Sequence, residues 1–288
     1  MNIQSSTKPI CLITGGTEGV GKATATDLAS RGFNVVIAAS NMAKAETVKA
    51  EIKKATGAKI DVMAVDLTSL HSVCQLAGTF ALRYPRLDVL INNAGIFAPK
   101  RVLTSDGFES SFQVNYLSHF LLTHLLLDPL KASEQGRVIN LSSSVYTAGK
   151  FDDRNLQSEN QFSVMGAYAA SKLFMLLFSV ELAERLRGTN VTSNAVHPGI
   201  VRTPMMLRAP GVFKVISYLA LPFSIAPQEG AATSVYLASS PTVRQVSGGY
   251  FTKCKQTVVK SKFNTKAIRD ALWKQTAEPL TRLGLINA

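Results

Sequence analysis

Residues 10–21 read Ile-Cys-Leu-Ile-Thr-Gly-Gly-Thr-Glu-Gly-Val-Gly, and this stretch decides how the chain folds. A short apolar run, Ile10 to Ile13, leads directly into a glycine-rich turn, and a helical pattern follows from Val20 to Ser30. An apolar run bounded by turn residues predicts a buried strand. Glycines at positions 15, 19 and 21 let backbone N–H groups and the positive helix end approach a pyrophosphate. A tight turn without a ligand is the alternative.

The same alternation of short apolar runs and longer helical patterns continues along the chain. Further strands are predicted at 35–38, 60–65, 87–91, 138–141 and 191–196, and further helices at 43–54, 70–84, 108–131 and 163–186. This order is typical of βαβ units, in which helices cover both faces of a parallel sheet. The predicted fold is α/β, a single doubly wound domain of the Rossmann type over residues 1–288.

Composition and charge restrict the class of protein. With 46% hydrophobic and 17% charged residues, the 288-residue chain is globular rather than disordered. Eight Lys and Arg against two acidic residues in 250–288 supply half of the net charge of +12. We interpret 250–288 as a basic tail that hints at an anionic membrane or partner surface, and without a recognised motif we expect no nucleic-acid binding.

Cysteines and apolar segments bear on the compartment. Cys11, Cys74 and Cys254 are scattered and lack CxxC spacing, which fits a reducing compartment. The polar start is unlike a signal peptide, and the uncharged segment 215–228 is too short to span a bilayer. We therefore expect a soluble, cytoplasmic protein, with peripheral membrane contact and a homodimer left open.

The end of the second predicted strand bears on the choice of dinucleotide. An acidic residue there would accept from the ribose 2′-hydroxyl and select NAD, but Ser40 and Asn41 occupy the position. NADP(H) is therefore favoured over NAD(H), with Lys44 as a candidate helper, although no Arg is present and Glu18 opposes a phosphate. Asp66 follows the third strand, where it could accept from an adenine amino group or cap the next helix.

Tyr168 and Lys172 are four residues apart in a helical pattern, so both lie on one face. A tyrosine with a pKa of about 10 is a poor base at neutral pH, and a nearby ammonium should lower that pKa. An exposed helix pair of no function is the alternative for this spacing alone.

Further motifs follow in order: Asn92-Asn93-Ala94-Gly95, Asn115 in a helix, Ser142-Ser143, and His197-Pro198-Gly199. With the glycine turn and Tyr168/Lys172, the whole chain resembles the short-chain dehydrogenase/reductase superfamily. Residues 115–123, 155–157, 197–203 and Leu272-Trp273 resemble its retinol-dehydrogenase-like and polyprenol-dehydrogenase-like branch. Enzymes of that branch act mostly on lipid alcohols and aldehydes.

The resemblance implies a role for each matching residue. Tyr168 is the acid/base, Lys172 lowers its pKa and holds the nicotinamide ribose, and Ser143 binds the reacting oxygen. Asn115 anchors a water of a proton relay or, alternatively, stabilises a helix kink. The implied dinucleotide contacts are Gly15, Thr17, Glu18, Gly19, Val20, Gly21, Ser40, Asn41, Asp66, Leu67, Asn93, Ala94, Gly95, Tyr168, Lys172, Pro198, Gly199, Val201 and Thr203. For Asn92, which precedes these residues in the motif, a purely structural role is the alternative.

The chain departs from that branch at Ser40, where arginine is frequent, and at Thr17-Glu18, where Asn-Ser is usual. Both departures concern the choice of dinucleotide. The resemblance implies hydride transfer between a nicotinamide and the carbonyl or alcohol of a hydrophobic, lipid-like, retinoid, prenyl or steroid-type substrate. The alternative is a dinucleotide-binding sensor with little turnover, although such proteins usually lose the tyrosine or lysine.

The segment 203–226 is strongly apolar and follows the sixth strand, so we expect a hydrophobic lid over the substrate. A core helix and shallow docking on a bilayer, assisted by Lys214 and Arg208, are the alternatives. No metal site is predicted, because the four histidines lack paired ligand spacing: His71, His119, His124 and His197.

Overall fold

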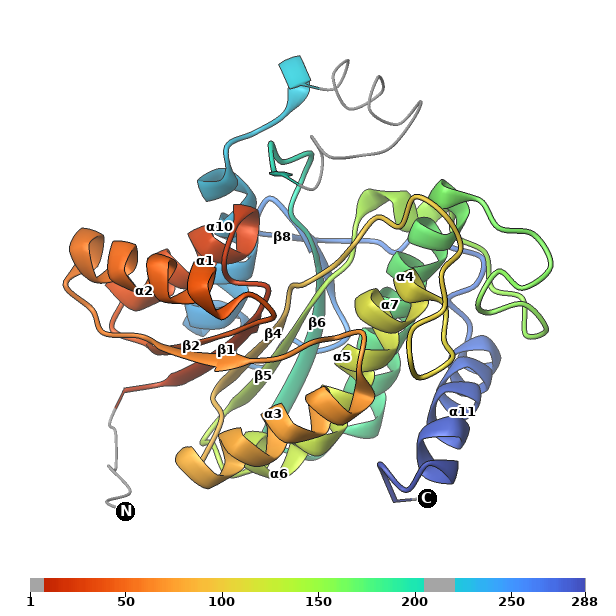
Figure 1. Ribbon diagram of the computed structural model, residues 1–288, viewed down its shortest axis with the longest axis horizontal. Coiled ribbons are helices and arrows are strands. Elements are labelled where there is room, and N and C mark those ends of the chain that lie inside the picture. Colours follow the sequence, from red (N-terminus) through yellow and green to blue (C-terminus); the bar gives the residue numbers. More distant parts are fainter. Residues whose placement is uncertain (1–7, 205–220, 288) are drawn as a thin grey trace.

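The computed structural model describes residues 8–204 and 221–287, and its centre is an eight-stranded sheet (Figure 1). Seven strands run parallel and the last is antiparallel. The strands are β1 Ile10–Thr14, β2 Asn34–Ala39, β3 Asp61–Ala64, β4 Val89–Asn92, β5 Gly136–Leu141, β6 Val191–His197, β7 Tyr250–Thr252 and β8 Lys255–Thr257. The six strands predicted before residue 200 are confirmed to within a few residues.

Helices cover both faces of the sheet, as the alternation of side chains along each strand requires. Ile10 and Leu12 point into one hydrophobic cluster, whereas Cys11 and Ile13 point into the other. One face carries α1 Gly19–Ser30, α2 Met42–Thr56 and α10 Pro227–Ser239 (Figure 1). The other carries α3 Leu70–Arg83, α5 Ser118–Leu125, α6 Leu127–Lys131, α7 Val164–Arg185 and α11 Lys266–Arg282. The doubly wound α/β fold is confirmed.

The strand order is β3-β2-β1-β4-β5-β6-β7-β8. The chain therefore builds outward in one direction from β1 to β3, then returns and builds the other way from β4. Ligands of open α/β sheets bind in the crevice beyond the carboxyl ends of the strands at such a reversal. The fold thus places a binding site beyond the ends of β1 and β4, where the glycine turn and Asn92 to Gly95 lie.

The prediction of one helix over 108–131 is wrong. The segment consists of a short α4, Ser110–Phe112, a π-helical turn over Gln113–Leu117, and then α5 and α6. Glu109 starts the segment by accepting from the N–H groups of Ser111 and Phe112. The break at Leu126 follows from Pro129, because proline has no N–H and its ring clashes with the carbonyl four residues before it.

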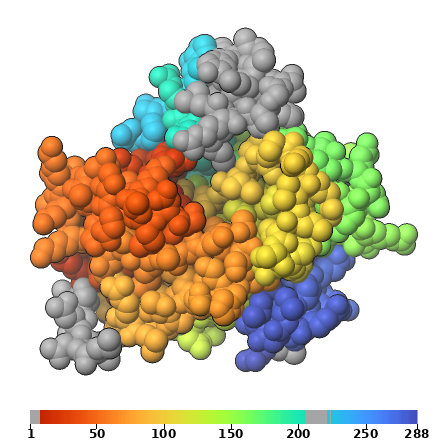
Figure 2. All heavy atoms as spheres, in the orientation of Figure 1, coloured from red at the N-terminus to blue at the C-terminus, as the bar shows by residue number. Residues whose placement is uncertain are grey.

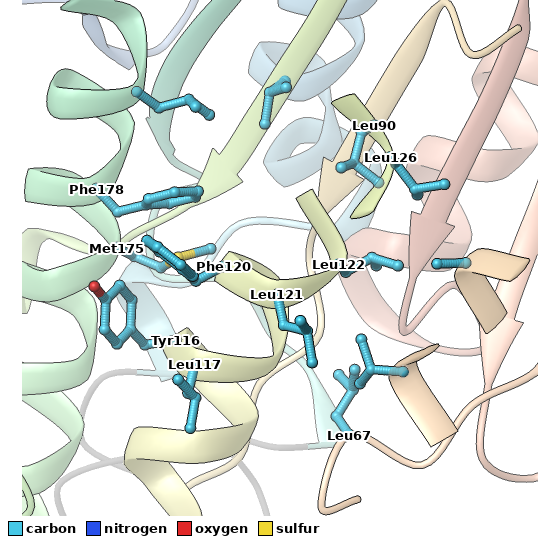
Figure 3. Packing of buried hydrophobic residues seen from close by; sticks show 14 of the residues in the cluster. Leu67, Leu90, Tyr116, Leu117, Phe120, Leu121, Leu122, Leu126, Met175 and Phe178 are labelled. Carbon is cyan, nitrogen blue, oxygen red and sulfur yellow. The ribbon is translucent and has the colours of Figure 1, made fainter. Parts of the chain in front are cut away.

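The interpretation of 250–288 as a tail is also wrong, because this segment forms β7, β8 and α11 on the core. Trp273 of α11 packs edge-on against Phe120 of α5, with ring centroids 4.8 Å apart. Figure 3 shows the layer beneath it, where Phe178 and Met175 of α7 meet Tyr116 and Phe120. The Tyr116 hydroxyl lies 2.7 Å from that of Thr276, which ties α11 to the π-helical turn.

Part of the basic charge of this segment is neutralised inside the protein. Glu181 of α7 is 2% exposed and pairs with Arg269, Lys266 and Arg185. A buried carboxylate is costly unless it is paired and hydrogen-bonded, and these three cations satisfy it. Basic residues of α11 therefore hold the helix on the core.

Among the described residues, α7 is the one helix long and apolar enough to cross a membrane, but most of that stretch is buried in the core. The predicted lid over 203–226 lies largely outside the described residues. Within its described part, Ile225 forms a bridge with Val201, which joins the segment after β6 to the start of α10.

Candidate active site

The three glycines of the turn after β1 are each needed for close contact. Gly15 and Gly19 have φ angles of +67° and +53°, a region that favours glycine. A Cβ at Gly21 would lie 2.3 Å from the Gly15 carbonyl oxygen and 2.4 Å from Asn93 Nδ2. A Cβ at Gly19 would lie 2.9 Å from Thr203 Cγ2. The turn, the loop after β4 and the loop after β6 therefore meet at the start of α1.

The N-terminus of α1 is open towards this meeting point. Glu18 is its N-cap residue, and within the described chain no side chain caps the helix. The Glu18 carboxylate instead pairs with the Lys44 ammonium of α2. Free N–H groups and the helix dipole favour an anion at this position. Thr17, Gly19 and Val20 line the same turn, as the sequence predicts.

The exposed end of β2 is close to that ion pair. Ser40 is exposed, and Asn41 uses its side-chain oxygen to cap α2 by accepting from the Lys44 N–H at 2.9 Å. The Asn41 amide group that remains is the part that could face a phosphate. The structure thus brings Ser40, Asn41, Lys44 and Glu18 into one polar rim.

The turn after β4 is fixed to the turn after β1 by Thr14. The N–H groups of Asn93 and Ala94 both donate to Thr14 Oγ1 at 3.0 Å. Asn93 also donates through its side chain to the Thr14 carbonyl at 2.8 Å. Asn92 is buried and bonded to Thr123 and Asn140, which agrees with its structural alternative. Asn93 to Gly95 are thereby held beside the glycine turn.

Asp66 lies exposed after β3 and is partly used by the backbone. Its Oδ1 accepts from the N–H and hydroxyl of Thr68, which leaves Oδ2 for a ligand. Ser69 caps α3 and accepts from the Ser72 N–H, so Asp66 is not the helix cap. Leu67 beside it is buried.

Tyr168 and Lys172 lie near the start of α7. The Lys172 ammonium lies 5.7 Å from the centroid of the Tyr168 ring and donates to the Leu141 carbonyl at 2.9 Å. Burial lowers the pKa of Lys172 to about 8 and raises the pKa of Tyr168 to about 12. The direction for Tyr168 is opposite to the expected one, because burial removes the hydration that would stabilise the phenolate. Tyr168 therefore keeps its proton at neutral pH.

The serines after β5 divide into a structural one and an open one. Ser142 is buried and donates to the Lys172 carbonyl at 2.7 Å, which joins β5 to α7. The Ser143 hydroxyl is half-buried and only accepts a long bond, 3.4 Å, from the Val145 N–H. Ser143 is therefore the hydroxyl that remains available for a ligand.

Asn115 lies in the π-helical turn with its side chain fully used. Its Oδ1 accepts from the Ile96 N–H at 2.7 Å, and its Nδ2 donates to the Ile96 carbonyl and to Ser171 Oγ, both at 3.0 Å. A Cβ at Gly95 would lie 3.2 Å from Asn115 Oδ1 and 3.4 Å from Lys172 Nζ. The absence of a side chain at Gly95 thus lets Asn115 and Lys172 come together.

The loop after β6 completes the surroundings. His197 accepts at Nδ1 from the Ser144 N–H, 3.2 Å away, and burial lowers its pKa. Gly199, which follows Pro198, has a φ of +94°, and the chain then continues to Thr203 at the glycine turn. Val201 is buried against Gly230 of α10.

Three functional neighbours were missed from the sequence. Thr14 ties two turns together, His119 bonds Thr14 and the Asn115 carbonyl, and Phe97 packs its ring 5.1 Å from that of Tyr168. A polar residue that ends an apolar strand, and a histidine four residues after Asn115, were signals that could have found the first two.

These residues fit a nicotinamide dinucleotide. The cradle beside Gly15 and Gly19 is one that a Cβ would fill, and the α1 N-terminus is open to a pyrophosphate. Figure 2 shows a hollow at this edge, between the orange-red spheres of α1 and the yellow spheres around residue 100.

Comparisons with known proteins agree with this geometry. The sequence pattern of the short chain dehydrogenase family matches residues 9–210. Retinol dehydrogenase 14 of Mus musculus is 41% identical over 281 residues, covering 91% of this chain and 83% of that protein. Retinol dehydrogenase 12 of Homo sapiens is 40% identical over 280 residues, covering 97% and 88%.

Solved structures share the fold. A protein from Mycobacterium paratuberculosis matches with a TM-score of 0.75 and 30% identity, over 95% of this chain and 93% of its own. A short chain dehydrogenase from Escherichia coli CFT073, complexed with NADPH, matches with a TM-score of 0.67 and 25% identity, over 86% and 97%. The chain therefore belongs to the short-chain dehydrogenase/reductase family, in its retinol-dehydrogenase-like branch, and is a nicotinamide-dependent oxidoreductase that acts on CH–OH groups.

Proposed function

We propose that the protein interconverts the carbonyl and alcohol of a hydrophobic, retinoid-like or prenyl-like substrate, using NADP(H) in preference to NAD(H). The observation that carries the proposal is the placement of Tyr168 and Lys172 beside Gly95, at the reversal of the sheet and next to an open helix N-terminus. When bound, the dinucleotide supplies or accepts the hydride at the nicotinamide C4.

The proposal gives each side chain a role that the family resemblance implies. Tyr168 Oη donates its proton to the carbonyl oxygen during reduction, and Ser143 Oγ donates a hydrogen bond to the same oxygen. Lys172, a buried ammonium beside the tyrosine ring, stabilises the phenolate that remains. Because the Asn115 side-chain amide is occupied by Ile96 and Ser171, we assign the relay water to the Asn115 peptide carbonyl.

Apolar side chains support the substrate class. The Phe97 ring packs on Tyr168, and Val102, Leu103 and Ile200 are exposed large hydrophobic residues on the segments that follow β4 and β6. Similarity to retinol dehydrogenases supports a long apolar alcohol or aldehyde. A cytoplasmic location, peripheral membrane contact and a homodimer stay predictions.

The substrate and the dinucleotide are tested together by measuring oxidation of NADPH and NADH with aldehydes and ketones from short-chain to retinoid and polyprenyl. We expect the highest kcat/KM with NADPH and a long apolar aldehyde. Equal kcat/KM across chain lengths would contradict the substrate class. Dinucleotide binding without turnover on any member would instead favour a sensor, a function that the intact Tyr168/Lys172 pair does not support.

The buried lysine predicts how reduction depends on pH. Lys172 carries its charge below its pKa of about 8, while Tyr168, with a pKa of about 12, stays protonated throughout. We expect kcat/KM for carbonyl reduction to fall above pH 8, approaching about tenfold per pH unit, because the charge that stabilises the phenolate is lost. Initial rates between pH 6 and 10 measure this decline.

Lys172→Arg is the control for that profile. Arginine keeps its charge at every pH of the measurement, so the decline should disappear even if the rate is lower. A decline that persists in this variant would assign the break to another group.

The ion pair between Glu18 and Lys44 predicts a change in dinucleotide preference. Both side chains are partly exposed and meet beside Ser40. We expect Glu18→Gln to free Lys44 for the 2′-phosphate and lower KM for NADPH by about fivefold, the scale of about 1 kcal/mol for a partly exposed pair. Lys44→Gln should raise KM for NADPH and leave KM for NADH unchanged.

Lys49→Gln is the matched control on the same helix, because Lys49 pairs with Glu46 instead of a residue of the turn. Its KM values should equal those of the wild type. If Lys44→Gln also leaves KM for NADPH unchanged, the assignment of Lys44 to the phosphate is wrong.

A further inference from the structure

His119 lies between Thr14, beside the glycine turn, and Asn115, and it has no part in the chemistry described so far. The imidazole is fully buried on α5. Its Nε2 lies 2.9 Å from Thr14 Oγ1, and its Nδ1 lies 3.3 Å from the peptide oxygen of Asn115. One ring therefore touches the residue that fixes the glycine turn and the carbonyl that we assign to the proton relay.

The partners of the ring determine its tautomer. A peptide oxygen only accepts, so Nδ1 must carry the hydrogen that it shares with Asn115. Thr14 Oγ1 already accepts from the N–H groups of Asn93 and Ala94, so its own hydrogen is free to go to Nε2. The alternative acceptor for that hydroxyl, the Ile91 carbonyl, is farther away at 3.5 Å. All these groups are satisfied only with the hydrogen on Nδ1.

The ring also stays neutral. Burial lowers the pKa of His119 to about 3, the bond to Asn115 acts against this shift, and the nearby Lys172 charge adds to it. His119 is therefore a fixed donor over the whole working pH range, neither a general base nor a pH switch.

The contacts continue from Asn115 to the catalytic helix. The Asn115 amide donates to Ser171 Oγ, and Ser171 donates to the Tyr168 carbonyl at 2.7 Å. A continuous set of hydrogen bonds thus runs from Thr14 at the glycine turn, through His119 and Asn115, to the turn of α7 that carries Tyr168.

We propose that His119 is a positioning residue, which holds the Asn115 peptide carbonyl for the proton relay and is itself oriented by the Thr14 hydroxyl. The inference rests on the proposed function, because the proton relay through Asn115 is part of that proposal. It assigns to the Nδ1–H bond an effect on kcat rather than on dinucleotide binding, since this bond is made to Asn115 and only the other ring nitrogen contacts Thr14 beside the glycine turn.

Two amide variants of His119 distinguish the contributions of its two ring nitrogens. His119→Asn keeps a donor near the Nδ1 position, whereas His119→Gln places its amide near the Nε2 position and loses the donor to Asn115. We expect His119→Asn to keep kcat within about threefold and His119→Gln to lower it by about tenfold or more. The dissociation constant for NADPH, measured by fluorescence, should change by less than about threefold in both.

An equal loss of kcat in both variants, with equally lowered melting temperatures, would overturn the proposal and leave His119 a packing residue. Unchanged kcat in His119→Gln would overturn it as well.

A measurement that needs no turnover separates this inference from the proposed function. The ¹⁵N chemical shifts of the His119 imidazole in the wild-type protein should show hydrogen on Nδ1, none on Nε2, and no titration between pH 5 and 9. Hydrogen on Nε2, or titration in this range, would overturn the inference. Absence of turnover on every carbonyl, together with the expected ¹⁵N shifts, would overturn the relay and the proposed function but not the tautomer.

Discussion

Tyr168→Phe lowers kcat by about 10³, because the variant loses the proton donor and keeps the ring that packs on Phe97. The phenol hydrogen is in place at neutral pH, since burial raises the pKa of Tyr168 to about 12. The affinity for NADPH should stay within about twofold, because the missing oxygen acts on the substrate. Single-turnover reduction and NADPH fluorescence titration measure the two quantities.

Tyr236→Phe is the matched control, because Tyr236 lies on α10 and its hydroxyl contacts only Thr242 at 3.0 Å among the hydrogen bonds of the described chain. This variant should retain wild-type kcat. Residual activity of Tyr168→Phe near a tenth of the wild type would show that another group protonates the substrate.

Gly21→Ala weakens NADPH binding by about 100-fold, the scale on which a displacement of about 1 Å acts in a site. The new methyl group would lie 2.3 Å from the Gly15 carbonyl oxygen, so the turn must move. The same overpacking costs about 1–3 kcal/mol of the free energy of unfolding. Fluorescence titration and denaturant unfolding separate the two effects.

Gly78→Ala is the control for that substitution. Gly78 is exposed on α3, and a Cβ there meets nothing within 4 Å. The change should leave NADPH binding unaltered and raise the free energy of unfolding by about 0.5–1 kcal/mol, because alanine favours a helix over glycine. If Gly21→Ala binds NADPH as tightly as Gly78→Ala does, the turn does not hold the dinucleotide.

The fold was predictable because its signals are local. Each parallel strand is a continuous apolar run, and the glycines after β1 mark the turn where backbone must approach backbone. The break at Leu126 also had a local signal, Pro129, which the helical periodicity of 108–131 outweighed. The spacing of Tyr168 and Lys172 predicted that the two side chains meet, as they do, whereas nothing local indicated Phe97 beside Tyr168.

The parts that sequence could not predict depend on contacts between distant segments. The pKa of Tyr168 follows from burial, which no spacing reports, and so its direction was predicted wrongly. The role of the Asn115 side chain depends on Ile96 and Ser171, which only the folded chain brings together. Residues 250–288 were interpreted as a basic tail, because Glu181, the buried partner of Lys266 and Arg269, lies on another helix and far away in the sequence.

The packing of α11 on α7 and α5 has a consequence for synthesis of the protein. The ribosome completes the helix that carries Tyr168 and Lys172 well before it makes Trp273 and Arg269, which cover that helix and pair with its buried Glu181. During this interval Phe120 and Phe178 lack the Trp273 ring that packs on them, and Glu181 lacks two of its three cations. We therefore expect the nascent chain to expose an aromatic surface until α11 emerges, and a chain truncated before α11 to aggregate although every residue of the candidate site has been translated.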